Sequence, residues 1–347
     1  MTRRMDPPRH AARHSYEDRP LHHYVLRVPA VAGAYWPVRH CGQLHGGIIA
    51  SHPMECPMSI PEDSTTEPAA EGSSPSDERL RTVSERMGRR IHMVVPVRHS
   101  PRLAEFMDRV NADDDLYATW EAANVNAVER LGMTDHGPVH VKIVLNIAVK
   151  LLRLLVDRGV QPSVTVNYGL EAQDAEVVVA AASLLHDIGM SIHRSNHEEY
   201  SLFLANGKIR ELLAGLYDTA TAAIMRAEIL HAIISHRAGG KPLTIEAGIV
   251  RTADALDMAK GRSRVPFTAG STSIHALSAA AIEAVHIESG TTKPVRLRIE
   301  MSNSAGVFQL DQLFREKLDG SGLEPYIELE AEIEGEGERR LFREFRL

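Results

Sequence analysis

From about Ile91 to residue 268, apolar residues recur every three or four positions, which is the spacing of an amphipathic helix. Thr134–Pro138 marks the start of one helix, because proline fits the first helical turn and Thr134 or Asp135 can cap the free amides. Asn196–Glu199 resembles a capping box that opens another helix. The predicted helices cover residues 113–131, 139–156, 174–185, 219–235 and 244–260, together with the one that begins at Asn196.

The pattern changes in the last eighty residues, where apolar and polar positions alternate as they do in half-buried strands. The predicted elements are the strands Ile282–Ile287, Val295–Glu300 and Tyr326–Ile333, with an amphipathic helix at Phe308–Leu318. Their order is β-β-α-β. The sequence therefore predicts a mainly α protein, with a helical domain over residues 91–268 and a small α+β module over residues 269–347.

Residues 1–90 show neither the helical nor the strand period over more than a few positions. The first hundred residues hold eleven of the 18 prolines and nine of the 18 histidines, and residues 61–76 are rich in Pro, Ser, Glu and Thr. Such a segment buries too little apolar surface to offset the entropy of ordering it, so we predict a disordered tail. An alternative is that translation starts at Met87 or Met93.

Composition excludes several classes of protein. The formal net charge of −7 argues against a general nucleic-acid coat or a polybasic membrane binder. The longest apolar runs, such as Val177–Leu185, are far shorter than the ~20 residues that span a bilayer. Two cysteines cannot form a disulfide framework or a thiolate zinc site. These features favour a cytoplasmic location, with no membrane partner and no strong nucleic-acid signal.

Several histidines and aspartates fall at or near the predicted helix ends, where each helix can bring one rigid group to a common point. Imidazole nitrogen and carboxylate oxygen are ligands that divalent transition metals accept, and an aspartate beside a histidine can bridge two metals. Any one of these histidines alone would more often be a helix cap. The case depends on the set, which comprises His140, His186, Asp187, His197, His236 and Asp254.

The motifs around these residues resemble the HD-domain metal-dependent phosphohydrolase superfamily. They are His140–Ala148, the segment Ala181–Gly189 that contains His186-Asp187, and the segment Ile249–Asp257 that contains Asp254. The resemblance implies a helical bundle in which His140, His186, Asp187 and Asp254 bind a metal. His197 and His236 fit the places of the further histidines in dinuclear members such as the HD-GYP group. It thus implies two divalent ions, and the ligands do not distinguish Mn, Fe, Co, Ni and Zn.

The chain departs from the HD-GYP pattern at two places. Met190 stands where that group has a lysine, and His236 is followed by Arg-Ala-Gly-Gly-Lys-Pro instead of a Gly-Tyr-Pro motif. These departures argue against hydrolysis of cyclic di-GMP. The chain looks more like a stand-alone branch of HD hydrolases with a C-terminal module of its own.

Other residues near these motifs are candidates for catalysis. We expect catalytic roles for Asp187, His193 and His236, with His193 either facing substrate or transferring a proton. His136, four residues before His140, is a weaker candidate, and His236 is preferred to His231 as a ligand because both cannot easily reach one site from a single helix.

Three cations follow Asp254 closely and suit an anionic substrate. Lys260, Arg262 and Arg264 are expected to bind phosphate oxygens, although cations at a helix end also complement its dipole. Asp257 can either hold one of these cations or orient a ligand histidine.

The function predicted from the sequence is metal-dependent hydrolysis of a phosphomonoester or phosphodiester, with a phosphorylated small molecule, foremost a nucleotide, as substrate. One alternative is a diiron oxygenase of the HD superfamily, which could use the same ligands. Another is an HD-derived sensor in which the C-terminal module binds a ligand; the intact His186-Asp187 pair and Asp254 argue against it. The module could also form a homodimer.

Overall fold

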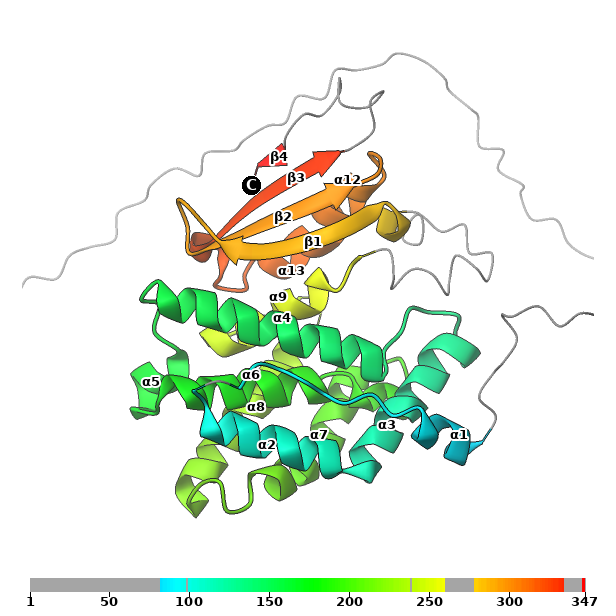
Figure 1. The fold of residues 1–347 in the computed structure, drawn as a ribbon, viewed down its shortest axis with the longest axis vertical. Coiled ribbons are helices and arrows are strands. Elements are labelled where there is room, and N and C mark those ends of the chain that lie inside the picture. The colour runs from blue at the N-terminus through cyan, green and yellow to red at the C-terminus, as the bar shows by residue number, and fades with distance from the viewer. Residues whose placement is uncertain (1–81, 98, 238, 260–277, 334–344, 347) are drawn as a thin grey trace, which may run out of the picture. The chain divides into compact units, whose positions relative to one another are not determined.

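The computed structural model describes residues 82–97, 99–237, 239–259, 278–333 and 345–346 (Figure 1). The helical part begins with short and medium helices and continues with longer ones; the elements are α1 (Val83–Gly88), α2 (Pro101–Ala112), α3 (Asp114–Asn124), the π-helix η1 (Val125–Arg130), α4 (Pro138–Asp157), α5 (Ser163–Tyr168), α6 (Ala172–Leu185), the 3-10 helix η2 (Ile188–Ser191), α7 (His197–Leu213), α8 (Thr219–Ser235) and α9 (Ile245–Leu256). The predicted mainly α fold is confirmed.

Helix α6 is the centre of the helical part. It packs against α4, α8 and α9, and most of its side chains are buried, including the run Val177–Leu185. Helix α4 starts with Pro138 in its first turn, and Asp135 Oδ1 accepts hydrogen bonds from the backbone N–H groups of Gly137 and His140, each at 3.1 Å. The start signal predicted from Thr134–Pro138 is thus confirmed, with Asp135 as the capping side chain.

Two predicted boundaries and one predicted cap differ from the structure. Thr82 caps α1 with a capping box, so a helix lies within the segment predicted to be disordered. Asn196 does precede α7, but its φ of 62° is left-handed and its side chain makes no capping hydrogen bond, so the predicted capping box is wrong. Helix α9 ends at Leu256 and not at Lys260.

A close backbone approach positions α7 against the turn after α6. A Cβ atom on Gly189 would lie 2.0 Å from the carbonyl oxygen of His197 and 2.5 Å from the backbone nitrogen of Ser201. The Gly189 N–H donates to Ser201 Oγ at 2.9 Å. Only glycine leaves room for this contact, which brings the first turn of α7 next to His186-Asp187.

The C-terminal module has the predicted β-β-α-β order, with one further short strand. Strand β1 (Ile282–Ser289) pairs antiparallel with β2 (Val295–Met301), β2 pairs parallel with β3 (Ile327–Ile333), and β3 pairs antiparallel with β4 (Phe345–Arg346). The crossover from β2 to β3 contains α12 (Gly306–Phe308), the π-helix η3 (Gln309–Phe314), α13 (Arg315–Leu318) and the 3-10 helix η4 (Glu324–Tyr326). Helix α13 packs against α9, and β1 packs against α4.

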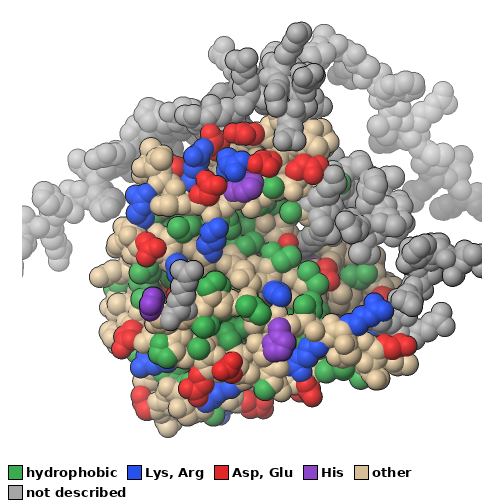
Figure 2. Space-filling model, viewed as in Figure 1, with side chains coloured by type: hydrophobic (Ala, Val, Ile, Leu, Met, Phe, Trp, Pro, Cys, Tyr) green, Lys and Arg blue, Asp and Glu red, His purple; other side chains and the backbone are tan. Residues whose placement is uncertain are grey.

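The polar face of this sheet carries charges of both signs. Basic and acidic side chains interleave over the sheet on the face in view (Figure 2). Arg296 pairs with Glu330, and Arg298 lies 3.7 Å from Glu288 across β1 and β2. The alternation gives a mixed surface and not a basic patch.

In the part of the chain that the structure describes, none of the helices is long and apolar enough to cross a bilayer.

Candidate metal centre

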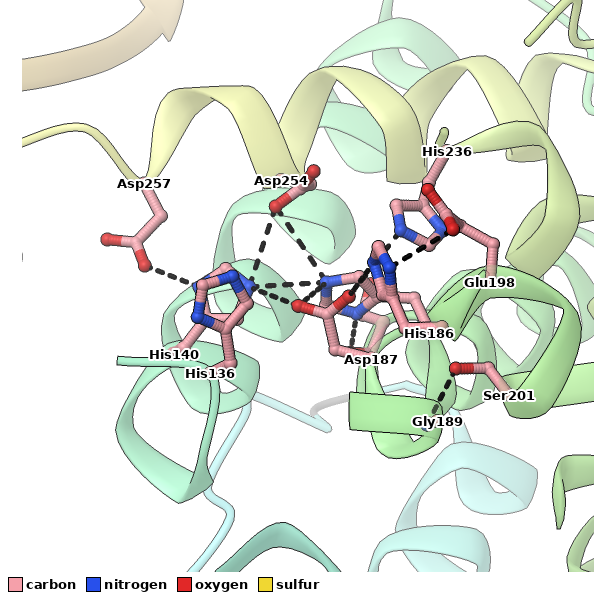
Figure 3. A network of polar contacts seen from close by, with 12 residues as sticks. His136, His140, His186, Asp187, Gly189, Glu198, Ser201, His236, Asp254 and Asp257 are labelled. Atoms are coloured by element: carbon pink, nitrogen blue, oxygen red, sulfur yellow. Dashed lines mark hydrogen bonds and ion pairs between the residues drawn. The ribbon is translucent and has the colours of Figure 1, made fainter. Parts of the chain in front are cut away.

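Helix ends bring the six predicted ligands together, as Figure 3 shows for most of them. Figure 3 also places Asp187 between the imidazoles of His140, His186 and His236. The ligands come from five helices: His140 in the first turn of α4, His186 and Asp187 directly after α6, His197 at the start of α7, His236 directly after α8, and Asp254 in the last turn of α9.

Asp187 lies at the middle of the cluster, with one carboxylate oxygen facing each of two pairs of histidines. Its Oδ2 atom is 3.4 Å from His140 Nε2 and 3.3 Å from His186 Nε2. Its Oδ1 atom is 3.2 Å from His197 Nε2 and 3.5 Å from His236 Nε2. Both oxygens of this carboxylate thus face histidine nitrogens of the cluster.

Asp254 adds a second carboxylate on the side of His140 and His186. Its Oδ1 atom lies 3.5 Å from His140 Nε2 and 3.8 Å from His186 Nε2. Three overlapping groups of candidate ligand atoms have all members within 4.8 Å of one another: His140, His186 and Asp187; His186, His236 and Asp254; and Asp187, His197 and His236.

The Nδ1 atoms of the four histidines show whether the cluster fits a metal. His186 Nδ1 lies 2.9 Å from the carbonyl oxygen of Ser183, His236 Nδ1 lies 2.5 Å from that of Ile233, and His197 Nδ1 lies 3.1 Å from that of Arg194. His140 Nδ1 lies 2.6 Å from Asp257 Oδ2. Because a carbonyl or carboxylate oxygen only accepts, the Nδ1 atoms of His140, His186 and His236 donate, and in the neutral ring the Nε2 lone pair is left for a metal. His197 Nδ1 lies 2.8 Å from a donor as well, the Nη1 atom of Arg194. The residues therefore fit a divalent ion.

Burial and charge oppose each other at the ligands. Burial alone would lower the pKa of His186, but the carboxylates of Asp187 and Asp254 outweigh it and raise that pKa to about 9. Burial alone would raise the pKa of Asp187, yet His186, His140 and His197 hold it well below its usual range. The pKa of Asp254 is likewise held low against its burial, first by Lys317 and then by His140 and His186. Burial lowers the pKa of His236, and the neighbouring His186 and Lys317 lower it further. Without a metal, a proton on His186 Nε2 thus partly balances the two carboxylates.

This balance predicts a pH dependence for metal binding. A metal must displace the proton of His186, so affinity for Mn²⁺ should rise between about pH 6.5 and about pH 9. Over the same window the metal-free protein should lose stability, because the pKa of His186 is higher in the folded state than in the unfolded state. Mn²⁺ titrations and thermal unfolding across this range would test both trends. A Mn²⁺ affinity independent of pH would contradict the prediction.

Asp257 takes one of the two roles that the sequence left open. Its carboxylate accepts from His140, 117 positions away in the chain, so it orients a candidate ligand histidine. The end of α9 at Leu256 is consistent with this role, because Asp257 has left helical geometry with ψ near 64°. The cations of the other role lie outside the described residues.

The structure does not bring every candidate into the cluster. His193 is exposed, and its Nδ1 accepts from the backbone N–H of Ser195 at 3.0 Å, so its predicted catalytic role has no support from geometry. His231 accepts from the backbone N–H of Leu243 and lies outside the cluster, which agrees with the preference for His236. His136 is buried with its ring centroid 5.7 Å from that of His140. The expected phosphate-binding residues Lys260, Arg262 and Arg264 lie outside the described residues.

Sequence reasoning missed four residues at this centre. Arg194 Nη1 lies 2.8 Å from His197 Nδ1, and Glu198 Oε2 lies 3.1 Å from the same atom. Lys317 Nζ lies 3.3 Å from Asp254 Oδ2, and Arg251 is buried beneath Lys317. Arg194 and Glu198 flank His197 in sequence and could have been found from that position. Nothing in the sequence around Lys317 points to the metal ligands.

Met190 shows why the departure from the HD-GYP pattern is compatible with this fold. Its side chain is fully buried and packs with Ala123 and Ala127, and with the partly buried Val128 and Met133. A lysine there would place a charge in an apolar cluster, at a high free-energy cost.

The fold and the cluster define a helical protein with a histidine–aspartate centre suited to a divalent metal. The chain belongs to the HD-domain family, whose model, described as HD domain, matches residues 139–259. That range contains all six predicted ligands. The chain is also similar to the uncharacterized protein MJ1020 of Methanocaldococcus jannaschii, with 42% identity over 214 residues that cover 62% of this chain and 83% of that protein.

Proposed function

We propose that this protein is a metal-dependent phosphohydrolase that cleaves a phosphomonoester or phosphodiester bond of a small molecule, foremost a nucleotide. Membership of the HD-domain family supports a metal-dependent hydrolase in general. The observation that carries the finer proposal is the position of Asp187, whose two carboxylate oxygens each face a pair of imidazole Nε2 atoms.

This geometry supports a centre for two divalent ions. One ion would be held by His140, His186, Asp187 and Asp254, and the other by His197, His236 and Asp187. When bound, such ions lower the pKa of water to make it nucleophilic and neutralise charge on a phosphoryl group.

The chain's own residues do the remaining work in this proposal. Asp257 holds His140 in the tautomer that leaves Nε2 available. The carbonyls of Ser183 and Ile233 do the same for His186 and His236. Lys260, Arg262 and Arg264, which follow Asp257 closely in sequence, are proposed to bind phosphate oxygens. The proposal gives no role to His193.

The test is metal analysis of the full chain purified without added metal, followed by a substrate panel with the metal found. The panel contains p-nitrophenyl phosphate, bis(p-nitrophenyl) phosphate, nucleoside mono-, di- and triphosphates and cyclic nucleotides. We expect hydrolysis of at least one class, lost on chelation and restored by the metal. If the protein hydrolyses none of these esters, the proposal is contradicted. Dioxygen consumption that requires iron would favour the oxygenase alternative.

A further inference from the structure

A lysine of the C-terminal module reaches the metal centre of the helical part. Lys317 in α13 places its Nζ atom 3.3 Å from Asp254 Oδ2 and also donates to the backbone carbonyl of His236. Two of the candidate ligands are thus in contact with a residue that lies outside the range of the HD-domain match.

The contact lies at the most exposed edge of the cluster. The side chains of His140 and His186 are 0% exposed and that of Asp187 is 5% exposed, whereas Asp254 is 16% and Lys317 is 20% exposed. Asp254 turns Oδ1 to the histidines and Oδ2 to the lysine. A small molecule that reaches the ligands from this edge therefore meets the Lys317 ammonium group beside Asp254.

A buried arginine fixes the backbone of Lys317. Arg251 is 1% exposed, and its Nε and Nη2 atoms donate to the carbonyls of Lys317 at 2.7 Å and Glu316 at 2.9 Å. Its Nη1 atom donates to the carbonyls of Arg237 at 2.6 Å and Gly240 at 2.8 Å. Arg251 thus ties the backbone of α13 to the segment that follows His236.

A lysine in this place is unfavourable for metal binding alone. Its charge repels a divalent ion at Asp254, and its Nζ atom, 3.3 Å from Oδ2, makes the carboxylate a weaker ligand. Two divalent ions, Lys317 and Arg194 together carry more positive charge than the four nearby carboxylates cancel, namely Asp187, Asp254, Asp257 and Glu198. An anion such as a phosphoryl group would balance this excess, and a lysine ammonium is a strong donor to phosphate oxygens.

We propose that Lys317 binds the anionic phosphoryl group of the substrate beside the metals, so that the C-terminal module supplies part of the active site. This role rests on the proposed phosphohydrolase function for its substrate class. It assigns the module a part in substrate binding and not only in packing.

Binding of inorganic phosphate to the full chain saturated with Mn²⁺ tests the proposal, with the affinity for Mn²⁺ measured separately. Lys317→Met should weaken phosphate binding about 10-fold or more, the loss expected for one charge-assisted hydrogen bond, and leave Mn²⁺ affinity unchanged or tighter. Lys317→Arg should stay within about 3-fold of the wild type because it keeps the charge. Arg315→Met on the same helix is the matched control, since Arg315 pairs with Asp311 and should leave phosphate binding unchanged.

The opposite pattern would overturn the role of Lys317. If Lys317→Met binds phosphate as the wild type does but loses Mn²⁺ affinity, the lysine only positions Asp254. Lack of phosphate binding by the Mn²⁺-loaded wild type would also overturn it. If Lys317→Met fails to fold, Lys317→Gln replaces it. Comparing Lys317→Gln, which lacks the charge, with Lys317→Arg, which keeps it, then makes the same test. Phosphate binding that depends on Lys317 in a protein that hydrolyses no ester would refute the proposed function and leave the anion site standing.

Discussion

Replacing Asp187 with alanine should abolish metal binding and reduce any phosphoesterase activity by at least about 10³-fold, because a metal centre contributes several kcal/mol to catalysis. Asp187 is the one residue of the cluster that contacts all four histidines through its two oxygens. Its loss removes a ligand from both groups at once. The loss of a charge beside His186 should also lower the pKa of that imidazole from about 9.

The measurements are Mn²⁺ titration and turnover of the best ester, with circular dichroism to verify the fold. Asp115→Ala is the matched control, because Asp115 is 80% exposed and pairs only at the surface with Lys208. Exposed pairs of this kind contribute about 0–1 kcal/mol, so this variant should bind metal and turn over normally. Retention of both properties in Asp187→Ala would place the chemistry elsewhere.

The largest effect on stability is expected for Arg251→Met. The substitution keeps an unbranched chain but leaves the carbonyls of Glu316, Lys317, Arg237 and Gly240 without their donor. Of the four hydrogen bonds, the one to Gly240 is buried and the others are partly buried. Buried polar groups left unpaired cost about 1–3 kcal/mol each, so we expect a total loss of about 3 kcal/mol in the free energy of unfolding. Denaturant unfolding of the full chain measures it.

Two further variants test whether the lost hydrogen bonds cause this loss of stability. Arg251→Lys keeps the charge but not the planar fork, and should fall between the wild type and Arg251→Met. Arg315→Met removes an exposed arginine that pairs with Asp311 at the surface, and should cost less than about 1 kcal/mol. Equal stability of Arg251→Met and the wild type would show that the carbonyls find other partners. Phosphate affinity should fall in Arg251→Met as well, because Lys317 loses its support.

Much of the fold could be predicted because its signals are local. Pro138 and Asp135 start α4, and the apolar run Val177–Leu185 requires a helix buried on all sides. The failure at Asn196 has a physical reason, since the residue types of a capping box are present but the left-handed backbone turns the side chain away from the amides. Sequence alone does not specify that dihedral angle.

Some residues of the candidate site could likewise be predicted from local sequence, and others could not. The histidine–aspartate cluster could be predicted because its motifs resemble those of the HD-domain family and fall at helix ends. His193 was expected to act because it is close in sequence to Asp187, yet the chain after η2 turns it to solvent. Lys317 and Arg251 come into contact only because α13 packs on α9. More than sixty residues separate them in the chain, so no local sequence pattern predicts this contact.

Three of the histidines share a hydrogen bond to the carbonyl three residues before them, namely His186 to Ser183, His197 to Arg194 and His236 to Ile233. Their rings are therefore held by the adjacent backbone, and most of their rotational entropy is lost during folding and not when an ion arrives. A centre preorganised in this way, with four imidazoles against two carboxylates, should discriminate strongly against Mg²⁺ and Ca²⁺, which require oxygen-rich and differently shaped coordination. The expected preference among metals thus depends on local hydrogen bonds at three separate helix ends.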